Sequence, residues 1–282
     1  MAGTTAPAAR SCPARFITNV EMSSGLIRLD CELDAPLPFR PGQFAMLNLA
    51  DGLPLVFSRP FSILAGDGTT LSFLYRVVGR GTAALARLKP GQGLTVLGPL
   101  GRPFPTPDEL EGRPAVLIGG GVGLPPVHAW FARHGRDGDT AFFGGRDGAD
   151  VPWSMLDARW GVSVDRAVDV PADREAFAGV VTELVASRGD LADGRTRAVL
   201  ACGPIPLLRA AARLAAARGW DCWVSLEEHM GCGYGVCKGC VVPVATAGPD
   251  GWRNATCCDE GPVFRADQIR WDRYGVPVLP TT

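Results

Sequence analysis

The stretch Gly231-Cys-Gly-Tyr-Gly-Val-Cys-Lys-Gly-Cys240 spaces three cysteines as Cys232-x4-Cys237-x2-Cys240, and Cys258 follows further along the chain. Plant-type 2Fe-2S sites use this spacing, with four thiolates around a small inorganic core. The interleaved glycines let such a loop fold tightly and bring backbone N–H groups close to the sulfurs. The sequence therefore predicts a C-terminal segment that is organised around a 2Fe-2S cluster.

Two other uses of these cysteines match the pattern less well. Structural zinc sites usually place two Cys-x2-Cys pairs at opposite ends of the motif, whereas here a single such pair follows a wider gap. A disulfide framework would suit a secreted chain. Residues 1–13 lack the apolar core of a signal peptide, and no later run is long enough to span a bilayer. We therefore expect a soluble, cytoplasmic protein. Spacing alone does not decide whether Cys257 or Cys258 is the fourth ligand.

Length and composition allow two domains of ordinary size and a small appendage, because the chain has 282 residues and is 46% hydrophobic. A formal net charge of -1 argues against nucleic acid or a membrane surface as the main partner. Nine cysteines in a cytosolic chain favour metal or redox chemistry. We expect a multidomain β plus α/β protein with four parts: a flexible tail (1–13), an antiparallel barrel (14–105), a parallel-sheet nucleotide-binding domain (106–222) and a cluster domain (223–282).

The first third of the chain has short apolar or alternating runs separated by turns, which is typical of a small antiparallel barrel. Strands are expected at 16–22, 25–31, 43–49, 60–64, 70–77 and 93–97. Arg59 begins one strand, and Gly81-Thr82 begins an expected helix at 83–88. A guanidinium fits a phosphate, and free N–H groups at a helix start attract negative charge, so together these residues predict an anion cradle. Taken singly, the arginine could be a surface ion pair and the threonine a helix cap.

The run Ala115-Val-Leu-Ile-Gly-Gly-Gly-Val-Gly123 is a buried-type strand that enters a glycine turn. Such a turn lets a pyrophosphate approach the backbone, although by itself it is a weak signal. The rest of the domain strengthens it, because an alternating layout favours a parallel α/β sheet. Further strands are expected at 140–143, 161–164 and 198–201, with helices at 128–133, 175–187 and 205–218. A short hairpin (241–245 and 251–255) and a helix-like segment (266–271) are expected after the cluster loop.

The cluster region closely resembles the electron-transfer subunit of type B dihydroorotate dehydrogenase. The resemblance rests on residues 225–242 and on Cys258-Asp-Glu-Gly-Pro-Val-Phe264. In that family the fourth cysteine directly precedes an acidic pair and Gly-Pro-Val-Phe, which implies that Cys258 is the ligand and Cys257 a bystander. The implied metal ligands are Cys232, Cys237, Cys240 and Cys258. The resemblance extends from the barrel to this end of the chain.

The barrel and the nucleotide domain are similar to those of the ferredoxin reductase family. This similarity implies a bound FAD that contacts Arg59, Pro60, Phe61, Ser62, Leu74, Tyr75, Arg76, Gly81 and Thr82. It implies that Cys202, Gly203 and Pro204 lie beside the nicotinamide of NAD(H), while the glycine turn itself predicts the pyrophosphate at Gly119, Gly120, Gly121 and Gly123. Without the upstream motifs, Cys202 would be better explained as a small buried residue at a strand end.

These resemblances imply an oxidoreductase subunit that passes electrons between NAD(H) and a partner through FAD and the 2Fe-2S cluster. The implied partner is the FMN-containing catalytic subunit that oxidises dihydroorotate in pyrimidine biosynthesis, in a heterotetramer with two copies of each. Alternatives are the small subunit of an NADH-dependent ferredoxin:NADP reductase and the flavin subunit of a sulfhydrogenase. A zinc-stabilised nucleotide sensor would be a different class, and it would be colourless.

Two details stay open at this point. Arg146 follows the second expected strand of the nucleotide domain and could meet the 2′-phosphate of NADP, but Asp147 beside it would oppose one; the family favours NAD. His128, His134 and His229 are each expected to be surface or packing residues rather than catalysts.

Overall fold

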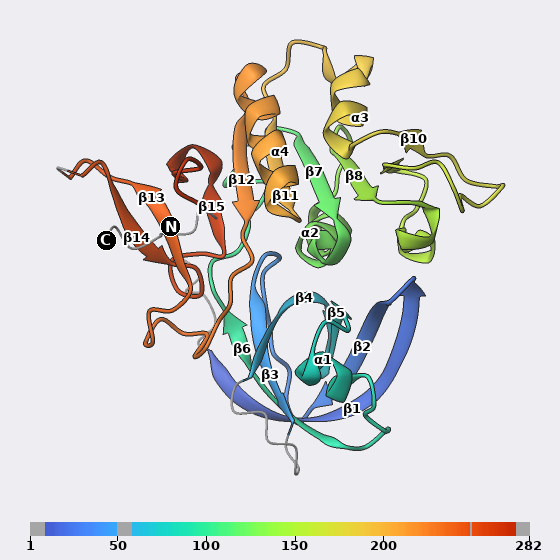
Figure 1. The fold of residues 1–282 in the computed structure, drawn as a ribbon, viewed down its shortest axis with the longest axis vertical. Helices are drawn as coiled ribbons and strands as arrows, with labels where there is room; N and C mark the ends of the chain where they lie inside the picture. Colours follow the sequence, from blue (N-terminus) through green and yellow to red (C-terminus); the bar gives the residue numbers. More distant parts are fainter. Residues whose placement is uncertain (1–8, 50–57, 249, 275–282) are drawn as a thin grey trace, which may run out of the picture.

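The structure, a computed structural model, describes residues 9–49, 58–248 and 250–274. It consists of a closed antiparallel barrel, a seven-stranded sheet and a two-stranded sheet. In Figure 1 the barrel lies at the bottom, the large sheet with its helices lies above it, and the orange and red C-terminal segment lies to the left. The predicted fold class is confirmed.

Six strands close the barrel in the order β1-β2-β5-β4-β3-β6. Their bounds are β1 (Arg10–Ser23), β2 (Leu26–Leu33), β3 (Phe44–Leu49), β4 (Arg59–Asp67), β5 (Thr70–Arg76) and β6 (Gly93–Leu100), with helix α1 (Arg80–Leu85) after β5. Alternate side chains fill the interior, among them Leu29, Cys31 and Leu33 of β2.

The start of the barrel corrects one expectation. Strand β1 begins at Arg10, and its first residues pair with β6, from Arg10 opposite Gly98 to Pro13 opposite Thr95. Cys12 is buried in the barrel, so this end of the strand is fixed by packing as well as by pairing. Residues 10–13 therefore belong to the barrel and not to a flexible tail; the boundary expected at residue 105 stays a prediction.

The large sheet has the order β10-β9-β8-β7-β11-β12-β15. Every pair of adjacent strands in it is parallel except the pair β12 and β15, which is antiparallel. Its strands are β7 (Ala115–Gly120), β8 (Thr140–Gly145), β9 (Trp160–Val164), β10 (Phe177–Ala178), β11 (Ala198–Cys202), β12 (Asp221–Ser225) and β15 (Val263–Arg265). The helices are α2 (Leu124–His134), α3 (Val181–Ser187) and α4 (Ile205–Ala217), with 3-10 turns η1 (Gly121–Gly123), η2 (Gly148–Asp150), η3 (Trp153–Met155), η4 (Gly189–Leu191) and η5 (Ala266–Gln268).

Successive residues of β7 face opposite layers, as a strand requires. Val116 and Ile118 belong to the core under α3 and α4, whereas Ala115 and Leu117 pack on the side of α2. Helix α2 also packs against β4, so it lies between the sheet and the barrel (Figure 1). The carboxyl ends of the parallel strands consequently face the barrel.

Two expected elements differ in the structure. The helix expected at 175–187 begins only at Val181, because Phe177 and Ala178 pair with β9 and Gly179 adopts a φ of 139° that a helix cannot contain. The helix-like segment expected at 266–271 is the short turn η5. Among the described residues, no helix has the length and apolar character that crossing a membrane demands.

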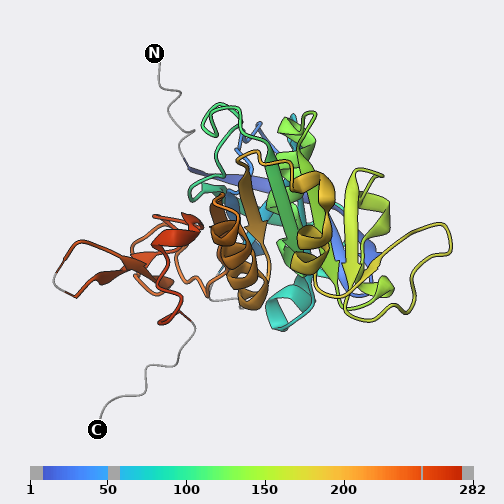
Figure 2. The same ribbon diagram turned by 90° about the horizontal axis from the view of Figure 1, so that it is seen from above.

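The C-terminal segment contains the expected hairpin, β13 (Val241–Ala245) with β14 (Trp252–Thr256). It projects sideways from the large sheet (Figure 2). Its last strand, β15, pairs antiparallel with β12. The domain boundary expected between residues 222 and 223 therefore falls inside a strand, and the segment shares the sheet of the nucleotide domain.

Candidate redox site

The four predicted cluster ligands lie in two pairs. The backbone N–H of Cys237 donates to Sγ of Cys232, and that of Cys258 donates to Sγ of Cys240, each at 3.4 Å. The described residues hold no group of three or more His, Cys, Asp or Glu side chains arranged for a single metal ion. Two pairs suit a two-iron core, because the four cysteines of such a cluster are divided between two irons. The residues present therefore fit the predicted 2Fe-2S cluster.

Backbone N–H groups of the loop point at the sulfurs. The N–H of Gly235 lies 3.1 Å from Sγ of Cys258, and that of Cys237 lies 3.4 Å from Sγ of Cys232. Burial alone would raise the pKa of the Cys232 thiol, but N–H groups of Cys237 and Tyr234 outweigh it and lower the pKa to about 6. Such donors stabilise thiolates, the form in which cysteine binds iron.

The adjacent cysteines differ in direction. Sγ of Cys257 is 3.5 Å from the carbonyl oxygen of Leu226, and burial raises the pKa of its thiol well above the usual range. Cys258 instead contacts Cys240. The ligand set stays a prediction, and this geometry supports Cys258 over Cys257.

The cluster loop packs directly on the barrel. A Cβ on Gly233 would lie 2.5 Å from Cγ of Met46 in β3, and the φ of Gly233 is 84°. Only glycine combines this backbone conformation with so close an approach. The glycine at this position therefore brings the loop against the barrel wall.

Beside the loop lies a cavity of about 500 Å³, here called the flavin cavity, between the barrel and the segment before Cys232. Its volume is in the usual range for cofactor sites. Seven of the nine residues predicted to contact FAD line it: Pro60, Phe61, Ser62, Leu74, Tyr75, Arg76 and Thr82. Arg59 and Gly81 lie outside this lining and contact each other, because a Cβ on Gly81 would lie 2.8 Å from Nε of Arg59.

Two hydroxyl groups in this cavity are already engaged with the protein. Oγ1 of Thr82 accepts hydrogen bonds from the N–H groups of Val78 and Gly79, at 2.9 and 3.1 Å. Tyr75 Oη donates to Asn19 at 3.3 Å, and burial raises the pKa of Tyr75 to about 12. The side chain of Thr82 thus acts as a cap for the backbone that enters α1.

Part of the flavin cavity was not predicted from the sequence. Residues 226–230 form one wall, with Phe44, Val78, Val122 and Pro262. His229 belongs to this wall and is exposed, which agrees with the surface position expected for it. The available signal was the position of residues 226–230, between a sheet strand and the first cluster cysteine.

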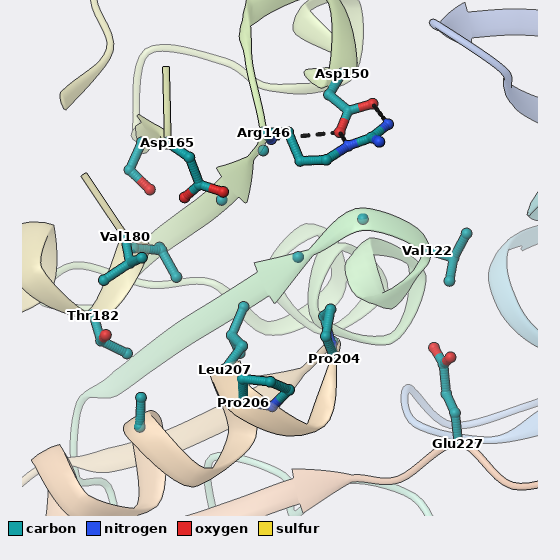
Figure 3. A pocket seen from close by; sticks show the side chains of 18 of the residues that line it. Val122, Arg146, Asp150, Asp165, Val180, Thr182, Pro204, Pro206, Leu207 and Glu227 are labelled. Carbon is teal, nitrogen blue, oxygen red and sulfur yellow. Dashed lines mark hydrogen bonds and ion pairs between the residues drawn. The ribbon is translucent and has the colours of Figure 1, made fainter. Parts of the chain in front are cut away.

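A second cavity, of about 670 Å³, lies at the carboxyl ends of the parallel strands and is here called the nucleotide cavity (Figure 3). Four predicted residues line it: Gly120, Gly121, Gly203 and Pro204. Gly119 and Gly123 instead permit close packing. A Cβ on Gly119 would lie 2.9 Å from Cγ2 of Val127, and one on Gly123 would lie 2.4 Å from the carbonyl oxygen of Cys202.

Cys202 is buried and is not among the described residues that line either cavity. Burial is the main cause that raises the pKa of its thiol, and the thiol shares a hydrogen bond with Ser225. This placement favours the packing role over contact with a nicotinamide. The catalytic role expected for Cys202 stays a prediction without support from this geometry.

The two cavities meet at three residues, Arg76, Val122 and Glu227, each of which lines both. In Figure 3 the Glu227 carboxylate points into the nucleotide cavity, toward Val122. Solvent reaches this carboxylate through the cavities, but the surrounding protein limits its hydration and raises its pKa. Because the two cavities share these three residues, a flavin ring in the flavin cavity would lie next to a nicotinamide ring in the nucleotide cavity.

The sequence matches known proteins over most of its length. The model of one family, the iron-sulfur cluster binding domain of dihydroorotate dehydrogenase B, matches residues 227–270. The dihydroorotate dehydrogenase B (NAD(+)) electron transfer subunit of Bacillus mycoides is 34% identical over 232 residues, which are 81% of this chain and 86% of that protein. The subunit of the same name from Listeria monocytogenes is 33% identical over 260 residues, or 91% and 97% of the two chains.

Solved structures share the fold. An NADH-dependent reduced ferredoxin-NADP oxidoreductase matches with a TM-score of 0.73 and 24% identity, over 96% of this chain and 92% of that one. A ferredoxin NADP+ reductase from Neisseria gonorrhoeae matches with a TM-score of 0.62 and 17% identity, over 75% and 93%. The fold is therefore ferredoxin reductase-like. Together with the sequence matches, this confirms the predicted resemblance: the chain belongs to the family of dihydroorotate dehydrogenase B electron transfer subunits.

Proposed function

We propose that the chain passes electrons between NAD(H) and a catalytic partner subunit, through FAD and a 2Fe-2S cluster, in the oxidation of dihydroorotate. The observation that carries the proposal is the continuity of the three sites. The nucleotide and flavin cavities adjoin at Arg76, Val122 and Glu227, and Met230 of the flavin cavity nearly adjoins the first cysteine, Cys232. Such a row supports transfer from nucleotide to flavin to cluster without a large movement.

The flavin cavity suits FAD. Bound FAD exchanges a hydride with a nicotinamide and passes single electrons to an iron-sulfur cluster. The protein's contribution is placement: Phe61 and Tyr75 form an apolar wall with their rings 6.0 Å apart, edge to face. Arg59, held against Gly81, would pair with the phosphates as a charged fork. FAD rather than FMN follows from the family.

The nucleotide cavity suits NAD(H). Gly120 and Gly121 offer backbone without side chains where a pyrophosphate would approach. Figure 3 shows Pro204, which follows Gly203 in the chain, on the side of the cavity nearer to Val122 and Glu227 than to Thr182. Val122 and Glu227 bound the path between the two rings. The nicotinamide would thus be positioned and shielded by this group of residues.

The tip of the cluster loop suits a partner surface. Tyr234 and Val236 are 54% and 72% exposed, and Cys237 beside them is exposed as well. Aromatic and apolar side chains are enriched at the centre of protein interfaces. We propose that an FMN-containing catalytic subunit docks over this tip, in a heterotetramer with two of each chain. The cytoplasmic location stays a prediction.

The test is electron flow with a defined partner. The native protein is isolated anaerobically with its co-purifying subunit, and NAD reduction by dihydroorotate is measured for the wild type, Cys258→Ser and Cys257→Ser. We expect NADH to reduce the flavin in all three. Dihydroorotate-dependent NAD reduction should fall about 100-fold or more in Cys258→Ser alone, because an oxygen ligand replaces one of four thiolates.

Two results would count against this assignment. Equal losses in both cysteine variants would remove the support for Cys258 as ligand. A large iron-sulfur flavoprotein as the co-purifying partner, with no reaction of dihydroorotate, would favour the ferredoxin:NADP reductase alternative, whose fold is equally compatible with this chain.

A further inference from the structure

The nucleotide cavity has two chemically different ends. Its junction with the flavin cavity at Val122 and Glu227 is where a nicotinamide has to lie for hydride transfer. The adenosine of the same nucleotide must then lie at the opposite end, where Figure 3 shows Asp165, Val180 and Thr182. NAD and NADP differ at this adenosine, in the 2′ position of its ribose.

We infer that the adenosine end of this cavity selects NAD(H) against NADP(H), and that Asp165 is the residue that decides. The inference rests on the proposed function, and it names the residue by which the protein distinguishes NAD(H) from NADP(H). Asp165 directly follows strand β9 and lines the cavity. Its carboxylate is exposed, and within the described part of the chain it takes part in no hydrogen bond or ion pair. It can accept a hydrogen bond from a ribose 2′-hydroxyl, and it repels a 2′-phosphate.

A second group at this end points to a ligand independently. Ser163 of β9 lines the cavity and is only 1% exposed, and its Oγ has no hydrogen-bond partner among the described residues. Buried hydroxyl groups are rarely left unsatisfied, because such a group has lost its hydrogen bonds to water. A ribose hydroxyl or adenine nitrogen would supply the missing partner.

Arg146, which follows β8 and lines the same cavity, is already paired. Nε and a terminal nitrogen of Arg146 donate to the two oxygens of Asp150, at 2.7 and 2.9 Å. These hydrogen bonds occupy the edge of the guanidinium that would grip a phosphate in a bidentate manner. Arg76 of the barrel donates to the same carboxylate at 3.0 Å, and the Asp150 side chain is only 9% exposed. Asp150 is thereby fixed, so it holds Arg146 away from a 2′-phosphate.

The structure also corrects the sequence-based expectation for Asp147. This carboxylate pairs with Arg166 at 2.6 Å, and it is not among the described residues lining the cavity. The groups that oppose a 2′-phosphate are therefore Asp165 and, through Arg146, Asp150.

The experiment uses the full chain loaded with FAD and cluster. Anaerobic flavin reduction is measured with NADH and with NADPH, and binding of ADP-ribose and of 2′-phospho-ADP-ribose is measured by calorimetry. The variants are Asp165→Asn and Asp165→Asn combined with Asp150→Asn. Asp173→Asn is the control, because it removes the same charge from an exposed residue outside the cavity.

We expect the wild type to prefer NADH by about 100-fold in kcat/KM, a ratio that one well-placed polar contact and one repulsion can supply. Asp165→Asn should reduce the ratio of kcat/KM for NADH to that for NADPH about tenfold. The double variant should reduce this ratio further, because Arg146 loses its ion pair with Asp150. The same order should hold for the two ADP-ribose ligands. The control should keep the wild-type ratio.

Equal use of NADH and NADPH by the wild type, or an unchanged ratio in Asp165→Asn, would overturn the inference. Failure of the proposed function looks different: neither nucleotide would reduce the flavin and neither ADP-ribose ligand would bind, which would overturn both. Binding without flavin reduction would reject the proposed hydride transfer alone, and the calorimetric ratio would still decide the role of Asp165.

Discussion

The flavin cavity and the nucleotide cavity adjoin, but they are built in different ways. The flavin cavity takes its walls from barrel strands, from Val122 after β7 and from residues 226–230 before the cluster. The nucleotide cavity lies mainly along the carboxyl ends of one parallel sheet. A molecule in the first contacts three distant parts of the chain, whereas one in the second depends mostly on the edge of a single layer. This difference suits a resident cofactor in the first and an exchangeable substrate in the second.

The largest effect that is confined to one cavity is expected from Gly123→Ala, which should impair the reaction with NADH but not the binding of flavin. The added Cβ would lie 2.4 Å from the backbone carbonyl of Cys202, so turn η1 or strand β11 has to shift. Displacing a positioning element by about 1 Å can reduce a rate about 100-fold. We expect flavin reduction by NADH to fall by about that factor, while the flavin content stays that of the wild type, as measured by stopped-flow absorbance and by released FAD.

Gly189→Ala is the matched control for this variant, since a Cβ there meets nothing within 4 Å. If Gly123→Ala lost its flavin together with its NADH activity, the two cavities would not be separable in the way that their walls indicate.

A smaller effect in the opposite cavity is expected from Gly81→Ala. The Cβ would displace the guanidinium of Arg59, whose Nε lies 2.8 Å away, and a flexible side chain can partly adjust. Loss of one charge-assisted hydrogen bond corresponds to about a tenfold weaker FAD affinity. Alanine also favours the helix, so unfolding of α1 should not contribute. Equilibrium titration of the flavin-free protein with FAD measures the change.

Gly79→Ala provides the comparison, because its φ of -173° is ordinary extended backbone and its Cβ would meet nothing within 4 Å. Equal weakening in both variants would show that Arg59 is not responsible. Affinity for ADP-ribose should be unchanged in each.

The smallest expected effect concerns Glu227, where the cavities meet. Burial raises its pKa above the value of about 4.3 in an unfolded chain. The folded form therefore holds the proton more tightly, so this group's contribution to stability is full below about pH 4 and is lost as the pH rises through the raised pKa. Glu227→Gln should accordingly unfold at a slightly higher temperature than the wild type at pH 7, and at the same temperature near pH 3.5. Thermal unfolding across this range tests it, and a difference that is independent of pH would contradict it.

The sequence predicted the elements whose signals are local. Alternation along β2 and the buried run of β7 were sufficient for the barrel and the sheet, because strand periodicity is written in neighbouring residues. The same reasoning failed where one residue overrides the pattern, as Gly179 does in the helix expected at 175–187. The same reasoning assigned residues 10–13 to a flexible tail, because the pairing of Arg10 with Gly98 leaves no signal in the neighbouring sequence.

The sequence predicted the site residues that belong to recognisable motifs, and it missed those that reach the cavities only through the packing of distant elements. Pro60 and Gly120 line their cavities as expected. Glu227 and His229 were missed because their role depends on where β12 ends relative to the barrel, which only tertiary structure sets. Cys202 was expected beside the nicotinamide from resemblance, yet its thiol is packed inside the protein.

The antiparallel pairing of β15 with β12 has a consequence for dividing the chain. Asp221 of β12 also forms ion pairs with Arg113 and with Arg265 of β15, so the C-terminal segment is fastened to the sheet by side chains as well as by backbone. A chain that ended before the cluster loop would leave one side of β12 without its neighbour, and an exposed strand edge invites pairing between molecules. The barrel and the nucleotide domain should therefore not be expressed or fused to another protein without the cluster segment, because that segment also protects the edge of the sheet against aggregation.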